Sequence, residues 1–189
     1  NKLAGGDVIV TLDDDSYFES DTALEDVVTE FEADPELGLL AFRTENYHSG
    51  GEEFPKLKTE PSRLEALVPF ISPMVTLPTG RIESDAIETT YFPGCGYAFR
   101  GSMWDEISDH PSSFFYGAYE DDLAFRVLKA GYRIKYLPVV TVKHMRSPKR
   151  AVPDTDRQRM MFENRVFIAI RHLPLRYVLL VTFLWSGRT

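Results

Sequence analysis

Three consecutive carboxylates follow an apolar segment near the start of the chain. The segment "VIVTL" leads into Asp13, Asp14 and Asp15, and an aromatic pair comes next. Like charges held side by side repel, which favours a cation or a helix terminus beside them. Asp13 and Asp15 lean to the same side of an extended chain, so together they could hold a hard divalent ion such as Mg²⁺ or Mn²⁺. The alternative interpretation is a solvated acidic cap at the end of a strand.

A second acidic cluster, Glu120, Asp121 and Asp122, opens a predicted helix. Acids in a first helical turn are stabilised by the helix dipole, which is a purely structural explanation. The aromatic stretch "FFYGAY" just before the cluster favours a catalytic interpretation instead. Aromatic side chains would shield a carboxyl group from water and raise its pKa toward that of a useful general base.

A third group follows a predicted strand that ends at His144, where Arg146, Lys149 and Arg150 come next. A strand-end histidine is either a structural residue or a nitrogen ligand for a metal, and the following cations are suited to a diphosphate. Cys95 is the one cysteine of the chain, so no internal disulfide forms, and a reducing compartment is favoured. We expect Cys95 to be a small packed residue and not a nucleophile.

The elements that must position these residues alternate between strands and helices. After a strand at residues 8–12, apolar spacing predicts a helix beginning at a Thr22/Glu25 capping box and ending at Asp34-Pro35. "LGLLAFR" predicts a buried strand. A long connection, with one helical piece near residues 61–72, is expected over 47–89.

The second half of the chain continues the alternation. A strand interrupted by Gly94 and Gly96 precedes a helix that begins near Ser102. A later helix closes at Gly131, followed by a strand, a break at Pro138, a second strand and a charged helix over 154–172. This order predicts an α/β domain with a mostly parallel sheet, in which ligands gather at the carboxyl ends of strands.

Composition limits the partners and the location. The net charge of −8 over 189 residues argues against nucleic-acid binding. The apolar stretch "LPLRYVLLVTFLW" is too short to span a bilayer, so it is either an interfacial, membrane-associated segment or a core helix. No signal segment is present and the chain begins inside a predicted sheet, so we expect an N-terminal part to be missing.

The order of these motifs resembles that of inverting family 2 glycosyltransferases with the GT-A fold, in particular the rhamnosyltransferase-like, non-processive members. The shared features are "LDDD", "PGCGYAFR", "ED" before "DLAFRVLKAGYRI", a strand-end histidine and a helix with "ENR". The resemblance covers most of residues 3–172. It implies a mostly parallel mixed sheet flanked by helices, without the N-terminal nucleotide-binding half. The catalytic part would be 1–172, followed by an apolar tail at 173–189.

The resemblance also implies roles for the acids and the histidine. Asp15 would bind Mn²⁺ or Mg²⁺ directly, Asp13 would act through water or the ribose, and His144 would be a further ligand. The general base would be Asp121. Because "EDDL" is one residue shorter than the family pattern, Glu120 remains an alternative base.

The remaining implied contacts concern the donor and the acceptor. The donor diphosphate would meet four residues: Asp14, Arg146, Lys149 and Arg159. The loop Gly94-Cys95-Gly96 would approach the sugar or acceptor, or would simply kink a strand. The "QxxRW" signature of processive synthases lacks its Trp here, so one transfer per encounter is expected.

These features together predict a metal-dependent transferase acting on a nucleotide-diphosphate sugar and a glycan or lipid-linked acceptor. It would be cytoplasmic, at the inner face of the cell membrane if the tail binds lipid, and this chain alone would have little activity. Two rivals remain: a sugar-nucleotide nucleotidyltransferase, and a non-catalytic carbohydrate- or partner-binding module.

Overall fold

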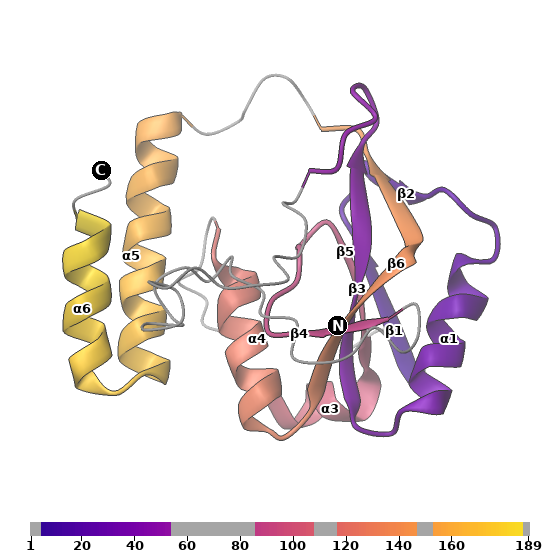
Figure 1. The fold of residues 1–189 in the computed structure, drawn as a ribbon, viewed down its shortest axis with the longest axis horizontal. Coiled ribbons are helices and arrows are strands. Elements are labelled where there is room, and N and C mark those ends of the chain that lie inside the picture. Colours follow the sequence, from indigo (N-terminus) through magenta and orange to yellow (C-terminus); the bar gives the residue numbers. More distant parts are fainter. Residues whose placement is uncertain (1–4, 54–85, 108–116, 147–152, 187–189) are drawn as a thin grey trace.

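A mixed sheet with helices on both faces forms the body of the molecule (Figure 1). The computed structural model describes residues 5–53, 86–107, 117–146 and 153–186. The predicted helical piece near 61–72 and the predicted diphosphate contact Lys149 lie outside these residues.

Six strands make up the sheet in the described part of the chain. Their order is β1 (Val8–Leu12), β5 (Gly96–Arg100), β3 (Leu37–Asn46), β6 (Arg133–His144) and β2 (Ser16–Phe18), while β4 (Ile87–Thr89) also pairs with β6.

Strand direction differs in part from the sequence-based prediction. Among the described strands, β3 and β6 run parallel, and the other pairs are antiparallel. The mixed α/β class is confirmed, whereas the expected predominance of parallel pairing is not found. The helix α1 (Ala23–Ala33) joins β2 to β3 across β6, but β2 runs antiparallel to β6 while β3 runs parallel to it, so this strand–helix–strand unit does not add a parallel pair.

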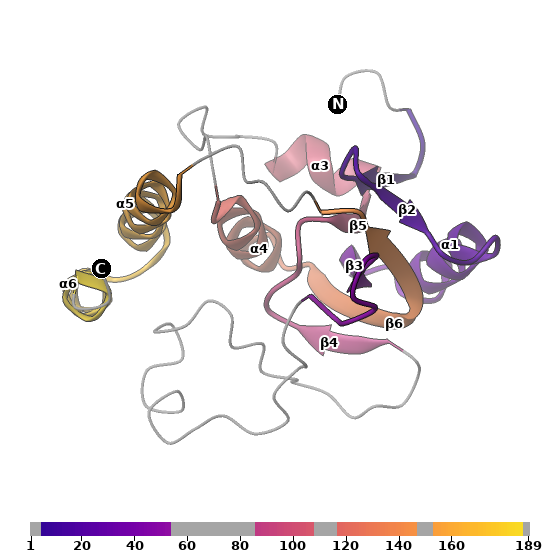
Figure 2. The same ribbon diagram turned by 90° about the horizontal axis from the view of Figure 1, so that it is seen from above.

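Two hydrophobic cores lie on the two faces of the sheet. One packs α1 against the sheet, and the other packs α3 (Gly101–Ile107) and α4 (Tyr119–Lys129) against the opposite face. Successive residues of a strand face opposite sides, so Leu40 and Phe42 of β3 enter the first core while Leu39 and Ala41 enter the second. Figure 2 shows the sheet between these helices.

The ends of α1 are fixed differently from the prediction. The helix begins after Thr22 and ends before Asp34 as expected, but no side-chain hydrogen bond caps its first turn, so the predicted capping box is wrong. The hydroxyl of Thr22 instead lies 2.9 Å from that of Ser20. At the other end, the guanidinium of Arg100 donates to the carbonyls of Phe31 and Asp34.

Strand β6 continues through Pro138, so the prediction of two separate strands is wrong. The parallel register with β3 jumps from Phe42↔Leu137 to Arg43↔Thr141. The proline therefore falls within an irregularity of the pairing, where its missing N–H is tolerated.

The end of α4 is as predicted. Gly131 adopts φ +88° and its N–H donates to the carbonyl of Leu128.

Two other boundaries differ from the prediction. Residues 87–89, which we expected to be part of a connection, form β4, and the strand expected around Gly94 begins at Gly96. The predicted helix near Ser102 is confirmed as α3.

At the C-terminal end, α5 (Asp154–His172) and α6 (Leu175–Ser186) lie side by side (Figures 1 and 2). Ala169, Leu173 and Val178 pack between them. Among the described helices, none has the length and apolarity needed to cross a membrane. Ile170, Leu175 and Leu179 are exposed, and the predicted contact of this tail with a lipid surface stays a prediction.

Candidate functional site

The acidic triplet occupies the turn between β1 and β2. The N–H of Asp13 donates to the carbonyl of Cys95 over 3.1 Å, and the N–H of Ser16 donates back to Asp13 over 3.0 Å. Because β1 pairs with β5 as far as Leu12↔Gly96, the end of β1 brings Asp13 beside the residue that precedes β5.

His144 reaches the same place from the end of β6. The antiparallel register sets Ser16 opposite His144, and the N–H of Met145 donates to the carbonyl of Asp15 over 2.8 Å. As a result, Nε2 of His144 lies 3.3 Å from Oδ1 of Asp15. Two residues 129 positions apart in sequence are thus brought together by strand pairing.

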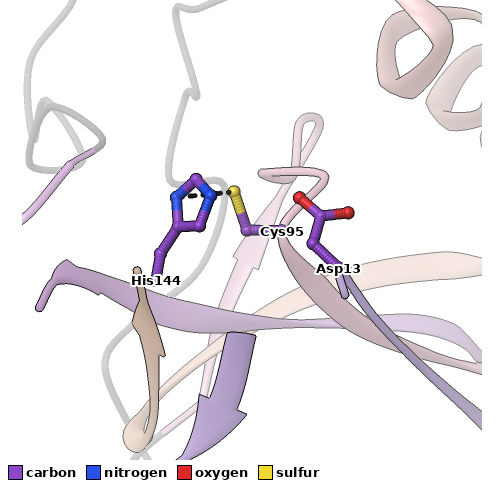
Figure 3. A group of neighbouring side chains, drawn as sticks. All are labelled: Asp13, Cys95 and His144. Atoms are coloured by element: carbon purple, nitrogen blue, oxygen red, sulfur yellow. Dashed lines mark hydrogen bonds between the residues drawn. The ribbon is translucent and has the colours of Figure 1, made fainter. Parts of the chain in front are cut away.

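Asp13, Cys95 and His144 form one cluster (Figure 3), in which each residue offers a ligand atom within 4.8 Å of the others. Sγ of Cys95 lies 3.6 Å from Nδ1 of His144. Burial raises the pKa of the Cys95 thiol well above its ordinary value, and the charges of Asp13 and Glu53 raise it further. Cys95 is therefore a buried, protonated thiol at neutral pH, as expected for a packed residue.

Glu53 belongs to this site and was missed by sequence reasoning. Its Oε2 lies 2.6 Å from Nδ1 of His144, and its side chain is 7% exposed. It stands in "HSGGEEF", a glycine-containing stretch without periodicity. The sequence offered only two adjacent acids, Glu52 and Glu53, as a sign of a site here. No sequence pattern indicates that Glu53 contacts His144, 91 positions later.

The second acidic cluster starts α4 and lies against the glycine-containing loop. Gly117 and Ala118 precede the helix with φ of +74° and +61°, and the side chain of Asn164 donates to the carbonyl of Gly117 over 2.9 Å. A Cβ on Gly94 would lie only 2.0 Å from Oε1 of Glu120. A larger residue at position 94 would therefore force the side chain of Glu120 to move.

The pKa values of this acid pair are raised. Burial raises the pKa of Asp121 to about 7; the charge of Arg165 opposes the rise and that of Glu120 adds to it. Burial also raises the pKa of Glu120, opposed by a backbone hydrogen bond and reinforced by the charge of Asp13. Through Asp13, Glu120 is thus electrostatically coupled to the cluster at the strand ends.

Asp122 has a different role from its two neighbours. Its buried carboxylate accepts hydrogen bonds from Nε of Arg126 at 2.8 Å and from Nε2 of His172 at 2.7 Å. Burial favours the neutral acid, but these partners outweigh it and hold the pKa of Asp122 below its ordinary value. Asp122 therefore joins α4 to the end of α5.

Comparison of the whole structure identifies the fold. This chain superposes on GalNAc-T7 solved with UDP, GalNAc and Mn²⁺ at a TM-score of 0.59 and 12% sequence identity. The match covers 89% of this chain and 32% of the GalNAc-T7 chain. It also superposes on S. aureus TarS residues 1–349 at a TM-score of 0.54 and 14% sequence identity. That match covers 99% of this chain and 48% of the TarS chain.

The chain has a GT-A fold. It spans about a third of the GalNAc-T7 chain and under half of the TarS chain. No protein-family model matches the sequence, and no curated protein matches it. The GT-A fold class is thus confirmed, whereas membership of family 2 and rhamnosyl specificity stay predictions.

The ligand atoms at the strand ends of this GT-A fold suit a hard divalent cation. Carboxylate oxygens and an imidazole nitrogen are ligands that Mn²⁺ accepts, and Mg²⁺ prefers the oxygens. Nε2 of His144 and Oδ1 of Asp15 are close enough to share one ion. The cluster of ligand atoms in the described residues contains Sγ of Cys95 together with Asp13 and His144, while Asp15 lies beside His144. The sequence-based set of Asp13, Asp15 and His144 stays a prediction.

The predicted diphosphate contacts are only partly described. Asp14 is exposed in the turn, and Arg146 is exposed just beyond β6. Arg159 lies on α5 with a side chain that is 66% exposed, and it forms an ion pair with Glu163 of the same helix at 3.5 Å. Their roles in donor binding, like that of Lys149, stay predictions.

Proposed function

We propose that this chain is part of a metal-dependent, inverting glycosyltransferase. It would transfer a sugar from a nucleotide-diphosphate sugar to a hydroxyl group of a glycan or lipid-linked acceptor. The observation that supports this most strongly is the position of His144, which lies 3.3 Å from Asp15 and in one cluster with Asp13, near the raised-pKa pair Glu120 and Asp121 on a GT-A fold.

The strand-end residues would bind the donor. Asp13, Asp15 and His144 would hold Mn²⁺ or Mg²⁺, which would supply positive charge to stabilise the departing diphosphate. The net charge of −8 favours such a contribution, because an acidic chain repels a diphosphate. Arg146, exposed two residues after His144, would supply a further positive charge.

The acid pair would activate the acceptor. The Asp121 carboxylate takes the proton from the acceptor hydroxyl, whose oxygen then attacks the anomeric carbon as the bond to the diphosphate oxygen breaks. A pKa of about 7 leaves much of this carboxylate ionised at neutral pH while keeping it basic enough to accept the proton. One displacement inverts the configuration of the anomeric carbon.

Glu120 is the alternative base. Its carboxylate rests on Gly94 and is electrostatically linked to Asp13, so it lies toward the metal-binding cluster. If Asp121 is the base, the role of Glu120 is instead electrostatic, because its negative charge raises the pKa of Asp121.

The test is sugar transfer by the complete protein that contains this chain. A panel of UDP-, GDP- and dTDP-sugars is offered with Mn²⁺ or Mg²⁺, and the anomeric configuration of the product is read by NMR. We expect one donor to be consumed with inversion, EDTA to stop the reaction, and Asp15→Ala to abolish it.

Two substitutions assign the base. Asp121→Asn and Glu120→Gln are compared with Glu25→Gln, a control at an exposed position on α1. The base variant should lose at least a hundred-fold in kcat, and the control should keep the wild-type rate. Consumption of no donor in the whole panel would contradict the proposal and favour the non-catalytic binding module.

A further inference from the structure

Glu53 is held on both of its carboxylate oxygens. Oε2 lies 2.6 Å from Nδ1 of His144, and Oε1 accepts a hydrogen bond from Nδ2 of Asn46 at 2.8 Å. The backbone N–H of Glu53 also donates to the carbonyl of Thr44 over 3.0 Å. The carboxylate is therefore fixed in place before any ligand binds.

The turn that carries Glu53 is itself tied to β3. The side-chain oxygen of Asn46 accepts hydrogen bonds from the N–H groups of His48 and Ser49, each at 3.0 Å. The N–H of Asn46 donates to Gly51 at 2.8 Å. Because Asn46 is also paired with His144 in the β3–β6 register, one asparagine holds both the turn and the carboxylate that faces the histidine.

This arrangement determines which imidazole nitrogen carries the proton. An ionised carboxylate can only accept a hydrogen bond, so Nδ1–H of His144 donates to Glu53 at 2.6 Å and Nε2 is the ring nitrogen left to bind a metal ion. Nε2 lies 3.3 Å from Oδ1 of Asp15, so the two atoms are close enough to bind the same cation.

We propose that Glu53 is a positioning residue that fixes the tautomer and orientation of His144 for binding the divalent cation. The inference deepens the proposed function and rests on its metal site. Glu53 does not touch the ion; it acts through the imidazole, in the way that carboxylates orient metal-ligating histidines. The neighbouring Glu52 is not part of this arrangement, because its Oε1 lies 3.3 Å from the hydroxyl of Tyr136.

The experiment measures Mn²⁺ affinity from the EPR signal of free Mn²⁺, without donor or acceptor. Wild type, Glu53→Gln and Glu53→Ala are compared, with Glu52→Gln as the matched control. We expect Kd for Mn²⁺ to rise ten- to hundred-fold in both Glu53 variants and to change less than two-fold in the control. Thermal unfolding without metal checks that the variants fold.

A second readout separates orientation from general structure. Long-range ¹H–¹⁵N spectra of the metal-free chain should show His144 protonated on Nδ1 in wild type, and that population should fall in Glu53→Ala. A folded Glu53→Ala variant with unchanged Mn²⁺ affinity and an unchanged tautomer would overturn the inference while leaving the proposed function intact. Absence of Mn²⁺ binding by wild type would overturn both.

Discussion

Replacing Asp121 by Asn should make the folded protein more stable at high pH while removing its activity. The pKa of Asp121 rises from an ordinary value of 3.8 to about 7, chiefly because the group is buried. Each pH unit of this rise corresponds to about 1.4 kcal/mol, so above pH 7 the charged carboxylate destabilises the folded state by at most about 4 kcal/mol.

The pH dependence fixes the sign of this effect. An acid whose pKa is raised by folding binds a proton on folding, so its contribution to stability falls as pH rises from about 4 to about 7. The neutral amide of Asn has no such loss. The stabilisation by Asp121→Asn should therefore be near zero at pH 4 and reach its full value above pH 7.

Urea unfolding at pH 5 and pH 8 measures the difference, with Asp122→Asn as the control on the same helix. The pKa of Asp122 is lowered, so its contribution is present above the ordinary pKa and is lost only as pH falls through the lowered value. Removing this buried charge from Arg126 and His172 should destabilise the protein by about 3–5 kcal/mol. If Asp121→Asn is no more stabilising at pH 8 than at pH 5, the raised pKa is wrong.

Two further predictions concern the loop before β5. Gly94→Ala should lower kcat more than ten-fold, because the new Cβ would lie 2.0 Å from Oε1 of Glu120 and would displace that carboxylate. Steady-state kinetics measure kcat, and a melting curve checks that the variant folds. A folded variant with the wild-type kcat would contradict the prediction. Cys95→Ser should keep activity within about three-fold, because burial raises the pKa of the thiol and leaves it protonated. Loss of more than a hundred-fold in a folded Cys95→Ser protein, measured in the same assay, would show that the thiol takes part in the reaction.

The sequence predicted those features that depend on local patterns. The apolar spacing in α1, the Gly131 terminus of α4 and the strand end at His144 are set by residues near one another in the chain. The convergence of Asp15 and His144 was expected from the family resemblance, and the pairing of β2 with β6 explains it.

Other features depend on contacts between distant segments. Glu53 meets His144 only because the turn after β3 folds back on the β3–β6 pair. In the sequence, Asp122 is the third acid of the run that begins with Glu120, and its role cannot be told from that of its neighbours. Its hydrogen bond with His172, fifty positions later, reveals a structural role. Pro138 favoured a strand end by local rules, yet an irregularity in the pairing with β3 accommodates it.

The central claim is that the acidic turn and His144 hold a divalent cation together with a nucleoside diphosphate. The most direct measurement is anomalous diffraction at the manganese absorption edge from crystals grown with Mn²⁺ and UDP or GDP. The account predicts one peak bounded by the carboxylates of Asp13 and Asp15 and by Nε2 of His144, next to the diphosphate. A diphosphate bound without a peak there, or a peak elsewhere in the chain, would contradict it.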